Sequence, residues 1–337
     1  MSIVNTFSLQ SNRQIKINFD GGDLSSDAGL LLIKEFISKL GIERLLNRSF
    51  KTNDSAVFRY HTDRDNLLQM IYMIMAGYFE DDASDELTKD PIFFNRMDED
   101  TLKQFQEISQ ILRKRIYSIQ MPQAVILDLD STLLAAYGKQ EGRAFNFHYR
   151  SNGYHPLVCY DGITGDLIKI QLRDGAAYSC TGVTDFLQPI LDEYLNDYPT
   201  IHLLLRGDSG FATPDLYKQC EENGTSYVIR LMENFIKESK SGFDFSAVSS
   251  HNRIVNANRV QVHALAYNIF NWFRRLVLSA KMRKQRIDTV RLKLLKIATK
   301  VVHSARYITF KLCSSCPYKE EFYDTLSAIG KLNVQLE

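Results

Sequence analysis

The sequence predicts a mixed α/β protein, and three observations lead to this fold class. In the first 120 residues, apolar side chains recur at the three- and four-residue steps of amphipathic helices. After Met121-Pro122 the chain contains short continuous apolar runs, which are typical of buried strands. Helical segments separate these runs, and such alternation indicates helices layered against a sheet. We therefore expect a mainly helical N-terminal region followed by an α/β core.

The N-terminal region is expected to contain one strand and three helices. The strand covers residues 15–19 and is followed by the turn Gly21-Gly22. Ser26 or Asp27 would cap the first helix, which extends through Leu40 and ends at Gly41. Two further helices are expected at residues 64–78 and 98–117.

The α/β core is expected to contain five strands and two helices before a long helical segment. A hairpin turns at Gly162-Ile163-Thr164-Gly165, and Pro214 lies in the first turn of a helix, where proline is favoured. From Met232 to Arg306 the chain has a helical pattern throughout. The expected strands cover residues 124–129, 154–160, 167–172, 201–205 and 226–231, and the helices residues 184–194 and 214–223.

Charge is distributed unevenly along the chain. Residues 251–312 contain fourteen Lys or Arg and one acid, Asp288, which gives this segment a net charge of +13. Because the whole chain has a formal charge of +1, the remainder has a charge of −12. An acidic body joined to a basic segment indicates a polyanionic partner such as nucleic acid.

Composition excludes several classes of protein. A hydrophobic content of 45% and a charged content of 24% are ordinary for a globular protein and argue against disorder. No apolar run reaches the roughly 20 residues that a membrane helix requires. The first residues lack the charged start and apolar core of a signal peptide. The five scattered cysteines favour a reducing compartment, so we expect a cytoplasmic protein without a membrane partner.

Four acidic residues are candidates for a metal site. Asp128 and Asp130 lie two apart on one strand, so their side chains share a face. Asp208 follows another strand, and Glu233 begins the helix after the last one. Ligand sites of parallel sheets lie beyond the carboxyl ends of the strands. Oxygen ligands suit Mg²⁺ or Mn²⁺, and two such ions about 3.5–4 Å apart would support in-line phosphoryl transfer.

A simpler interpretation exists for each aspartate. Asp130 precedes Ser131-Thr132 and could cap a helix, while Asp208 precedes Ser209-Gly210 and could form an Asx turn. Spacing alone does not decide between these local roles and a shared site.

One junction lacks the residues that a turn requires. The strand-like segment that ends at Leu231 runs directly into the helix-like segment that begins at Met232, with no Gly, Pro, Asn or Ser between them. Strand-to-helix connections usually contain 2–6 residues of turn chemistry. Either the strand ends early or a segment is missing at this point.

Several short sequence motifs in the chain resemble those of the DDE transposases of bacterial insertion sequences, specifically the insertion-sequence family numbered thirteen-eighty. The similarity covers essentially the whole chain, and the motifs are specific only when taken together. They are Val-Ile-Leu-Asp-Leu-Asp-Ser-Thr (125–132), Gly-Tyr-His-Pro-Leu (153–157), Leu-Arg-Asp-Gly (172–175), Leu-Arg-Gly-Asp-Ser-Gly-Phe (205–211), Glu-Asn-Phe-Ile-Lys-Glu-Ser-Lys (233–240), Ser-His-Asn-Arg (250–253) and Leu-Ala-Tyr-Asn (265–268).

The resemblance implies a ribonuclease-H-like mixed sheet flanked by helices, which binds two divalent ions, Mg²⁺ or Mn²⁺. It implies Asp130 as the first catalytic acid, with Asp128 as the alternative, Asp208 as the second and Glu233 as the third. Lys240, seven residues after Glu233, would contact DNA. The implied partners are double-stranded terminal inverted repeats and target DNA, bound by a homodimer, at the nucleoid of a bacterial cell.

The chain also departs from this family. Such enzymes usually contain a long strand-rich insertion between the second and third acids, whereas Asp208 and Glu233 are only 25 residues apart here. The family also places a Tyr seven residues and an Arg four residues before the Glu, and these positions are Ser226 and Ile229. We interpret Leu231-Met232 as the seam of an internal deletion that impairs activity.

The basic segment is expected to contact DNA phosphates. Its apolar stripe indicates a helix packed on the core, and charges opposite such a stripe usually only face solvent. A solvated face is normally mixed in sign, however, so fourteen cations beside one acid favour phosphate contact. The expected DNA-binding residues are Lys240, Arg253, Arg259, Arg274, Arg275, Arg283, Lys284 and Arg286.

These observations divide the chain into three expected domains and leave three functions open. Residues 1–120 would bind DNA ends and contact a second subunit, 121–250 would form the catalytic core, and 251–337 would form a basic helical region. No nucleotide-binding glycine motif is present, and the lone pair Cys313 and Cys316 lacks the further ligands of a zinc site. The leading function is a transposase; the alternatives are a non-catalytic DNA-binding remnant that inhibits intact copies, and a plain metal-dependent nuclease.

Overall fold

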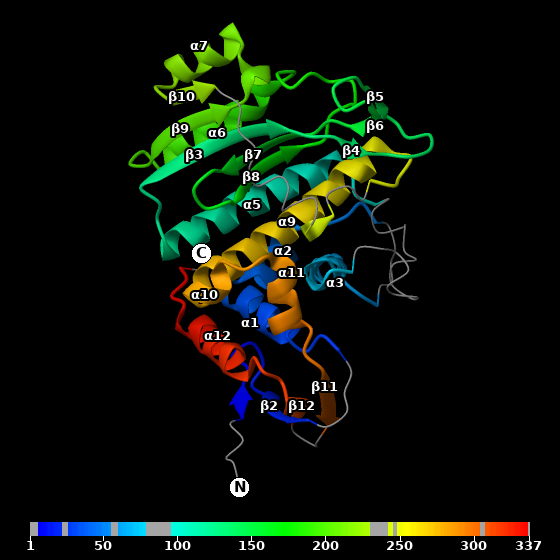
Figure 1. Ribbon diagram of the computed structural model, residues 1–337, viewed down its shortest axis with the longest axis vertical. Coiled ribbons are helices and arrows are strands. Elements are labelled where there is room, and N and C mark those ends of the chain that lie inside the picture. The colour runs from blue at the N-terminus through cyan, green and yellow to red at the C-terminus, as the bar shows by residue number, and fades with distance from the viewer. Residues whose placement is uncertain are drawn as a thin grey trace.

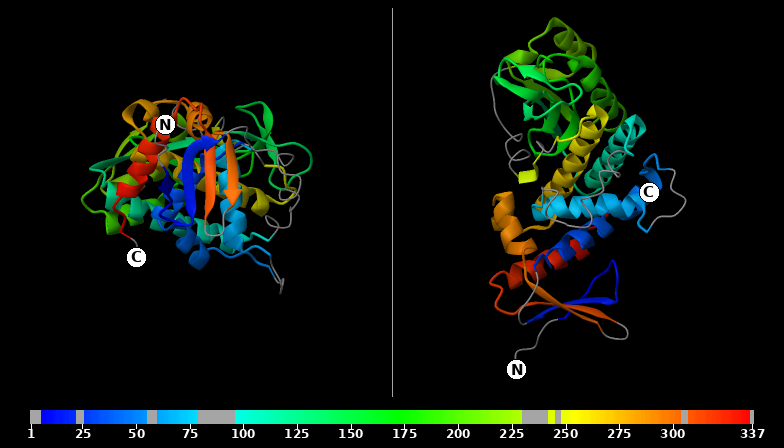
Figure 2. Two further views of the ribbon diagram at one scale, coloured as in Figure 1. Left: turned by 90° about the horizontal axis from the view of Figure 1, so that it is seen from below. Right: turned by 90° about the vertical axis from the view of Figure 1, so that its right-hand side faces the viewer.

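The molecule is elongated, with an α/β layer at one end and a helical part with a second sheet at the other (Figures 1 and 2). The computed structural model describes residues 6–21, 26–54, 60–78, 96–229, 242–244, 248–303 and 307–335. The predicted Glu233, Lys240 and the Leu231-Met232 seam lie outside these residues.

A five-stranded sheet forms the α/β layer, in the order β10-β9-β3-β7-β8. Its strands β9 and β10 run parallel to the central β3, whereas β7 and β8 run antiparallel to their neighbours on the other side. This order and these directions are those of a ribonuclease-H-like fold, so the predicted fold class is confirmed. The bounds are β3 (Ala124–Ser131), β7 (Leu157–Asp161), β8 (Leu167–Gln171), β9 (His202–Gly207) and β10 (Ser226–Ile229).

Helices connect these strands as the apolar pattern predicts. α6 (Val183–Asp197) joins β8 to β9, and α7 (Pro214–Glu222) joins β9 to β10. Thr213 caps α7 through its side chain, and Pro214 occupies the first turn. The long helix α5 (Glu99–Ile119) precedes β3 and begins with a capping box at Asp98.

A small three-stranded sheet follows β3 and was not predicted. Its strands lie in the order β4-β6-β5, all antiparallel. They are only two to four residues long, and they contain polar residues that show no alternating pattern. The bounds are β4 (Leu134–Ala135), β5 (Ala144–Asn146) and β6 (Ser151–Tyr154).

The helix α9 (Arg253–Val277) connects the two ends of the molecule (Figure 1). It seals the edge strand β8, because the Asn268 side chain accepts from Leu167 N and donates to Leu167 O, both at 2.8 Å. Tyr267 Oη donates to Gly165 O at 2.8 Å. A sheet edge buried by a helix needs such partners for its backbone groups. The motif Leu-Ala-Tyr-Asn at 265–268 therefore has a structural role in the packing of α9 against β8.

The chain's two terminal segments share the second sheet, in the order β1-β2-β12-β11. The central pair, β2 and β12, is parallel, so residues 15–21 lie beside residues 308–313. Helices of the N-terminal and C-terminal segments pack above this sheet in Figure 1. The strands are β1 (Phe7–Ser8), β2 (Ile15–Gly21), β11 (Thr299–His303) and β12 (Ile308–Cys313), and the helices α1 (Leu30–Lys39), α2 (Ile42–Ser49), α3 (Asp63–Ala76), α10 (Ala280–Arg283), α11 (Ile287–Val290) and α12 (Lys319–Lys331).

Two local predictions are wrong. The helical pattern predicted up to Arg306 ends earlier, because β11 begins at Thr299, where the β-branched residues Thr299, Val301 and Val302 favour a strand. The first helix begins at Leu30 and not after a Ser26 or Asp27 cap. The N–H groups of Ala28 and Gly29 instead donate to Ile297 O and Leu295 O of the C-terminal segment.

The expected end of that first helix at Gly41 is confirmed, since Gly41 adopts a left-handed φ of 65° that glycine tolerates best. Within the described residues, no helix combines the length and apolar character needed to cross a membrane.

Candidate functional site

The ends of β3 and β9 bring two of the predicted acids together. The register of these parallel strands pairs Leu127 with Leu205 and Asp128 with Arg206. Asp130 follows Asp128 by two residues and Asp208 follows Arg206 by two, so both acids lie at the same end of this strand pair. Both carboxylates therefore lie at the carboxyl ends of neighbouring parallel strands, where ligand sites of such sheets form.

A serine from a third segment confirms that these strand ends are close. We call residues 174–182, between β8 and α6, the serine loop. Ser131 Oγ donates to Ser179 Oγ at 3.0 Å. A Cβ added to Gly210 would lie 3.0 Å from Asp208 Oδ1 and 3.1 Å from Ser179 Oγ. Ser179 therefore lies between the residue that follows Asp130 and the turn that contains Asp208. Ser179 was not predicted to be part of the site.

Local hydrogen bonds orient both carboxylates. Asp208 Oδ1 accepts from Gly210 N at 2.8 Å, so the Asx-turn interpretation is confirmed. Asp130 Oδ1 accepts from Ser131 N at 2.7 Å. The interpretation of Asp130 as a helix cap is wrong, because β3 continues through Ser131 and is followed by β4. The turn role of Asp208 is compatible with a shared site, since it fixes where the carboxylate lies.

Asp128 has a different role from Asp130. Both of its carboxylate oxygens accept hydrogen bonds from the Arg206 guanidinium, and this ion pair is mostly buried. The hydrogen bonds that Arg206 donates to Asp128 raise the pKa of Arg206. A Cβ on Gly162 would lie 2.7 Å from Asp128 Oδ2, so the pair is also tightly enclosed. Asp128 is neutralised by Arg206, and this favours Asp130 as the first acid.

Arg173 holds the serine loop in place. Its Nη1 donates to the carbonyl oxygens of Tyr178, Ser179 and Thr181 at 2.7–3.1 Å, and its Nε donates to His155 O at 2.9 Å. Only 7% of Arg173 is exposed, and burial lowers its pKa to about 10. Its Nη2 has no hydrogen-bond partner within the described part of the chain.

His155, which lies between β6 and β7, also contacts the serine loop. Its Nδ1 donates to Ala177 O at 2.7 Å, and burial lowers its pKa. His155 of the motif Gly-Tyr-His-Pro-Leu and Arg173 of the motif Leu-Arg-Asp-Gly therefore both hold the serine loop, which lies beside Asp130 and Asp208.

Asp130 and Asp208 fit part of a divalent metal site. Two carboxylates on neighbouring strand ends supply the oxygen ligands that Mg²⁺ and Mn²⁺ prefer. Across the described ranges, no group of three or more His, Cys, Asp or Glu is arranged to hold a metal. The expected third ligand, Glu233, lies outside those ranges. At Cys313 and Cys316, a turn joins the two residues through a bond from Cys316 N to Cys313 O, and burial raises the pKa of the Cys316 thiol.

A family model described as "Transposase DDE domain group 1" matches residues 7–96, 93–232 and 231–334. The chain belongs to this family of transposases. No curated protein matches the sequence. Among solved structures, a piggyBac transposase synaptic complex with hairpin DNA is similar at 16% identity and a TM-score of 0.31. That similarity covers 60% of this chain and 50% of the other, so the chain spans half the length of the solved transposase.

The basic residues of this transposase-family chain fall into two groups at opposite ends of α9. Arg253 and Arg259 lie near its start, where Arg253 Nε is 3.4 Å from Asp174 Oδ1 of the serine loop. Beyond its other end lie four exposed cations that form no ion pair with any described residue; we call Lys281, Arg283, Lys284 and Arg286 the basic cluster. Because α9 has 25 residues, the two groups are separated by about 37 Å along the helix.

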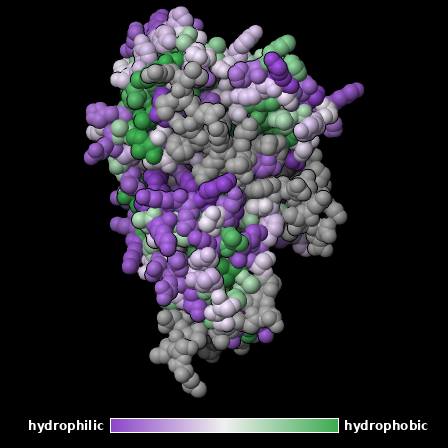
Figure 3. Space-filling model, in the orientation of Figure 1, coloured by the Kyte–Doolittle hydropathy of each residue, from purple (hydrophilic) through white to green (hydrophobic). Residues whose placement is uncertain are grey.

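The basic cluster is part of a larger polar surface. Figure 3 shows hydrophilic side chains gathered over the region that α10, α11 and α12 occupy in Figure 1. Two other expected DNA-binding residues, in the last turn of α9, form contacts within the fold. Arg275 forms a mostly buried ion pair of 2.7 Å with Asp166, and Arg274 Nη2 donates to Asn271 Oδ1 at 2.9 Å. The charge of Arg275 is already balanced within the fold.

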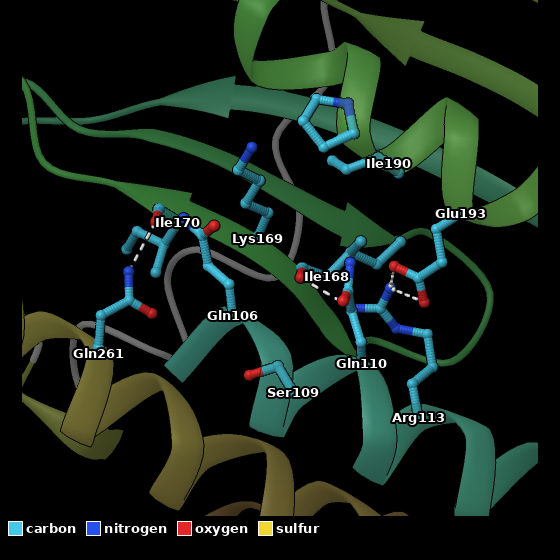
Figure 4. Close-up of a pocket in the computed structure, with 11 residues that line it drawn as sticks. Gln106, Ser109, Gln110, Arg113, Ile168, Lys169, Ile170, Ile190, Glu193 and Gln261 are labelled. Atoms are coloured by element: carbon cyan, nitrogen blue, oxygen red, sulfur yellow. Dashed lines mark hydrogen bonds and ion pairs between the residues drawn. The ribbon is translucent and has the colours of Figure 1, made fainter. Parts of the chain in front are cut away.

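A pocket on another part of the transposase core is separate from the two acids. It lies between α5, β8, α6 and α9 (Figure 4). Arg113 closes one end by an ion pair of 2.8 Å with Glu193, and Lys169 Nζ donates to Phe186 O at 2.9 Å. β7 lies between β8 and the acid-bearing β3. We therefore assign this pocket to packing between helices and sheet.

Proposed function

We propose that the chain is a DDE-type DNA transposase of the thirteen-eighty family that cleaves and joins DNA at terminal inverted repeats, and that an internal deletion impairs it. The observation on which this depends is that Asp130 and Asp208 lie at the carboxyl ends of two neighbouring parallel strands in a chain that belongs to a transposase family. Asp130, Asp208 and Glu233 are the proposed catalytic acids, in a soluble complex of two copies with DNA.

The two carboxylates would act by holding divalent cations. When bound, Mg²⁺ or Mn²⁺ would stabilise the attacking and leaving oxygens of an in-line phosphoryl transfer. The nucleophile would be water in the cleavage step and the hydroxyl of a DNA 3′ end in the joining step. Two hydrogen bonds within the chain hold these carboxylates in position. Gly210 N donates to Asp208 Oδ1, and Ser131 N donates to Asp130 Oδ1.

The separation of the basic groups suggests how DNA would lie. About 37 Å divides Arg253 and Arg259 from the basic cluster, and one turn of B-DNA covers about 34–36 Å. A duplex along α9 would therefore contact the site at one point and the basic cluster about one turn away. Such contacts to phosphates would set affinity and position and not the choice of sequence.

Three observations support the proposed deletion. The expected turn residues are absent at Leu231-Met232, and two segments of the family match meet at these residues. The exposed position Ser226 and the position Ile229, both on β10, do not supply the Tyr and Arg of the resembled family. A misplacement of Glu233 by about 1 Å could cost about 10²-fold in rate.

An electrophoretic assay on labelled terminal-repeat DNA with Mn²⁺ tests this proposal. We expect weak cleavage that disappears in Asp130→Asn and in Asp208→Asn. We also expect faster cleavage after a family insertion is restored at Leu231-Met232. Cleavage that survives both substitutions would disprove the role of the acids, and equal rates with and without the insertion would disprove the impairment.

A second candidate function is a non-catalytic DNA-binding remnant that competes with intact copies. The basic cluster favours it, because these cations lie about 37 Å along α9 from Arg253 and Arg259 and require no intact site. Metal-independent binding without any cleavage would distinguish the remnant from the enzyme. Cut but never joined products would indicate a plain nuclease.

A further inference from the structure

A loop of exposed aromatic side chains lies beside the two acids. We call residues 144–150, which comprise β5 and the turn that leads to β6, the aromatic loop. Phe147 is 85% exposed, and Phe145 and Tyr149 are also exposed. The rings of Phe145 and Phe147 meet edge to face at 5.2 Å. Tyr178 of the serine loop is 80% exposed. Single exposed apolar residues are ordinary, but a group of exposed rings indicates an interaction surface.

The aromatic loop is held rigidly. The buried side chain of Asn146 donates to Gly175 O at 2.9 Å, and its oxygen accepts from the backbone N–H groups of His148 and Tyr149 at 3.1 and 3.2 Å. These bonds fix the turn that presents Phe147. The rings are therefore displayed by a preorganised turn, which reduces the entropic cost of binding a ligand.

Two contacts place this surface beside the acids. Tyr149 Oη donates to the carbonyl oxygen of Ser131, the residue after Asp130, at 3.3 Å. Tyr178 directly precedes Ser179, which contacts Ser131 and lies against the Asp208 turn. Rings on two segments thus flank the ends of β3 and β9.

The charges around the rings favour a polyanionic ligand. His148 and Arg150 of the aromatic loop are exposed beside Phe147. Arg143 precedes the loop and donates from Nε to Ala136 O at 2.8 Å. Asp130 and Asp208 by themselves would repel a nucleic acid, so cations and ring faces beside them are the groups that could hold a strand there. Interleaved aromatic and cationic side chains are the usual surface for unpaired nucleotides.

We propose that Phe147 and Tyr178 stack on unpaired bases of the DNA strand whose phosphate lies between Asp130 and Asp208. Bases in a duplex already stack on their neighbours, so ring faces of the protein are accessible only to bases that have left the helix. The proposal rests on the proposed function, because it assigns the strand that the acids would act on. It adds a preference for a frayed or single-stranded end, independent of sequence.

Binding measured without metal tests this stacking separately from catalysis. The full chain is titrated in EDTA with a blunt duplex and with the same duplex extended by a short unpaired 3′ tail that contains 2-aminopurine. We expect tighter binding of the tailed duplex and quenching of the 2-aminopurine fluorescence. Phe147→Ala and Tyr178→Ala should each lower the tail preference about tenfold. The control Tyr60→Ala removes a fully exposed ring that precedes α3 and should leave the preference unchanged.

The outcomes distinguish this inference from the proposed function. Equal affinity for blunt and tailed DNA, or a preference that survives both substitutions, would overturn the stacking proposal even if cleavage depends on Asp130. A tail preference that needs Phe147, in a chain that never cleaves DNA, would support stacking and contradict the transposase. A dimer that forms without DNA and dissociates in Phe147→Ala would show that the rings contact a second copy and would overturn the proposal.

Discussion

The hydrogen-bonding surroundings of polar groups differ between the two ends of the five-stranded sheet. At the β7–β8 hairpin, Asn268 and Tyr267 of α9 satisfy the backbone of residues 165–167, so this end is closed. At the opposite end, Asp130 and Asp208 accept hydrogen bonds from the backbone N–H groups of Ser131 and Gly210, beside the serine loop. Saturated polar groups stabilise one end of the sheet, while the arrangement at the other end suits the binding of cations and DNA.

The largest expected effect comes from the acidic end. Asp130→Asn or Asp208→Asn should reduce cleavage by more than the roughly 10–100-fold that the loss of an outer partner of a metal site causes. The free energy of unfolding should change little, because an asparagine side-chain oxygen can accept the same hydrogen bonds from Ser131 N and Gly210 N. Cleavage and urea denaturation of the same preparations measure the two effects. Asp197→Asn, an exposed acid at the end of α6, is the matched control and should behave as the parent chain.

Asp128 should show the reverse behaviour. Asp128→Asn leaves the Arg206 guanidinium mostly buried without its counter-ion, and breaking such a pair costs about 3 kcal/mol of unfolding free energy. Replacing both partners, as Asp128→Leu with Arg206→Met, should restore most of this loss. Urea denaturation checks both variants. A stability loss in Asp130→Asn as large as that in Asp128→Asn would contradict the distinction between the two aspartates.

The closed end should affect stability alone. Asn268→Ala leaves the N–H and C=O of Leu167 without their partner, and the expected cost is about 2 kcal/mol of unfolding free energy. Cleavage per folded molecule should stay at the parent level, since Asn268 lies at the end of the sheet away from the acids. A selective loss of cleavage in this variant, with stability unchanged, would show that the two ends are not independent.

The smallest expected effect is a dependence of stability on pH. Burial lowers the pKa values of His155 and His263 in the folded state. The unfolded chain therefore binds more protons below about pH 6.5, so stability is fully present above that pH and falls as the pH drops towards the folded-state pKa values. Each histidine adds at most about 1.4 kcal/mol per pH unit to this slope.

Urea denaturation from pH 7.5 to 5 measures the slope. His263→Asn should reduce it, whereas the exposed His202→Asn should not. A slope that is identical in the parent chain and in His263→Asn would show that His263 is not the group that titrates.

Much of the core could be predicted because its signals are local. Continuous apolar runs mark β3 and β9, and an acid follows each run, so the sequence alone indicates Asp130 and Asp208 as candidates. The small sheet β4-β6-β5 was missed because strands of two to four residues have no period. Ser179 and Arg173 were missed because their roles arise from contacts between segments far apart in sequence.

Long-range pairing also explains why the charge pattern was only partly informative. Arg275 belongs to the basic segment but pairs with Asp166, which is 109 residues away. Arg291 is buried and donates to the backbone oxygens of Ile74 and Met75 in α3. A count of charges along the chain does not separate such cations from the exposed basic cluster, because the distinction depends on tertiary contacts.

Binding of Mn²⁺ to the full chain tests whether Asp130 and Asp208 hold a divalent cation, because it does not require the chain to cleave DNA. Electron paramagnetic resonance of free Mn²⁺ would be followed in the parent chain and in Asp128→Asn, Asp130→Asn and Asp208→Asn. We expect binding to be weakened in Asp130→Asn and in Asp208→Asn and to be retained in folded Asp128→Asn. Parent-level Mn²⁺ binding in both Asp130→Asn and Asp208→Asn would contradict it.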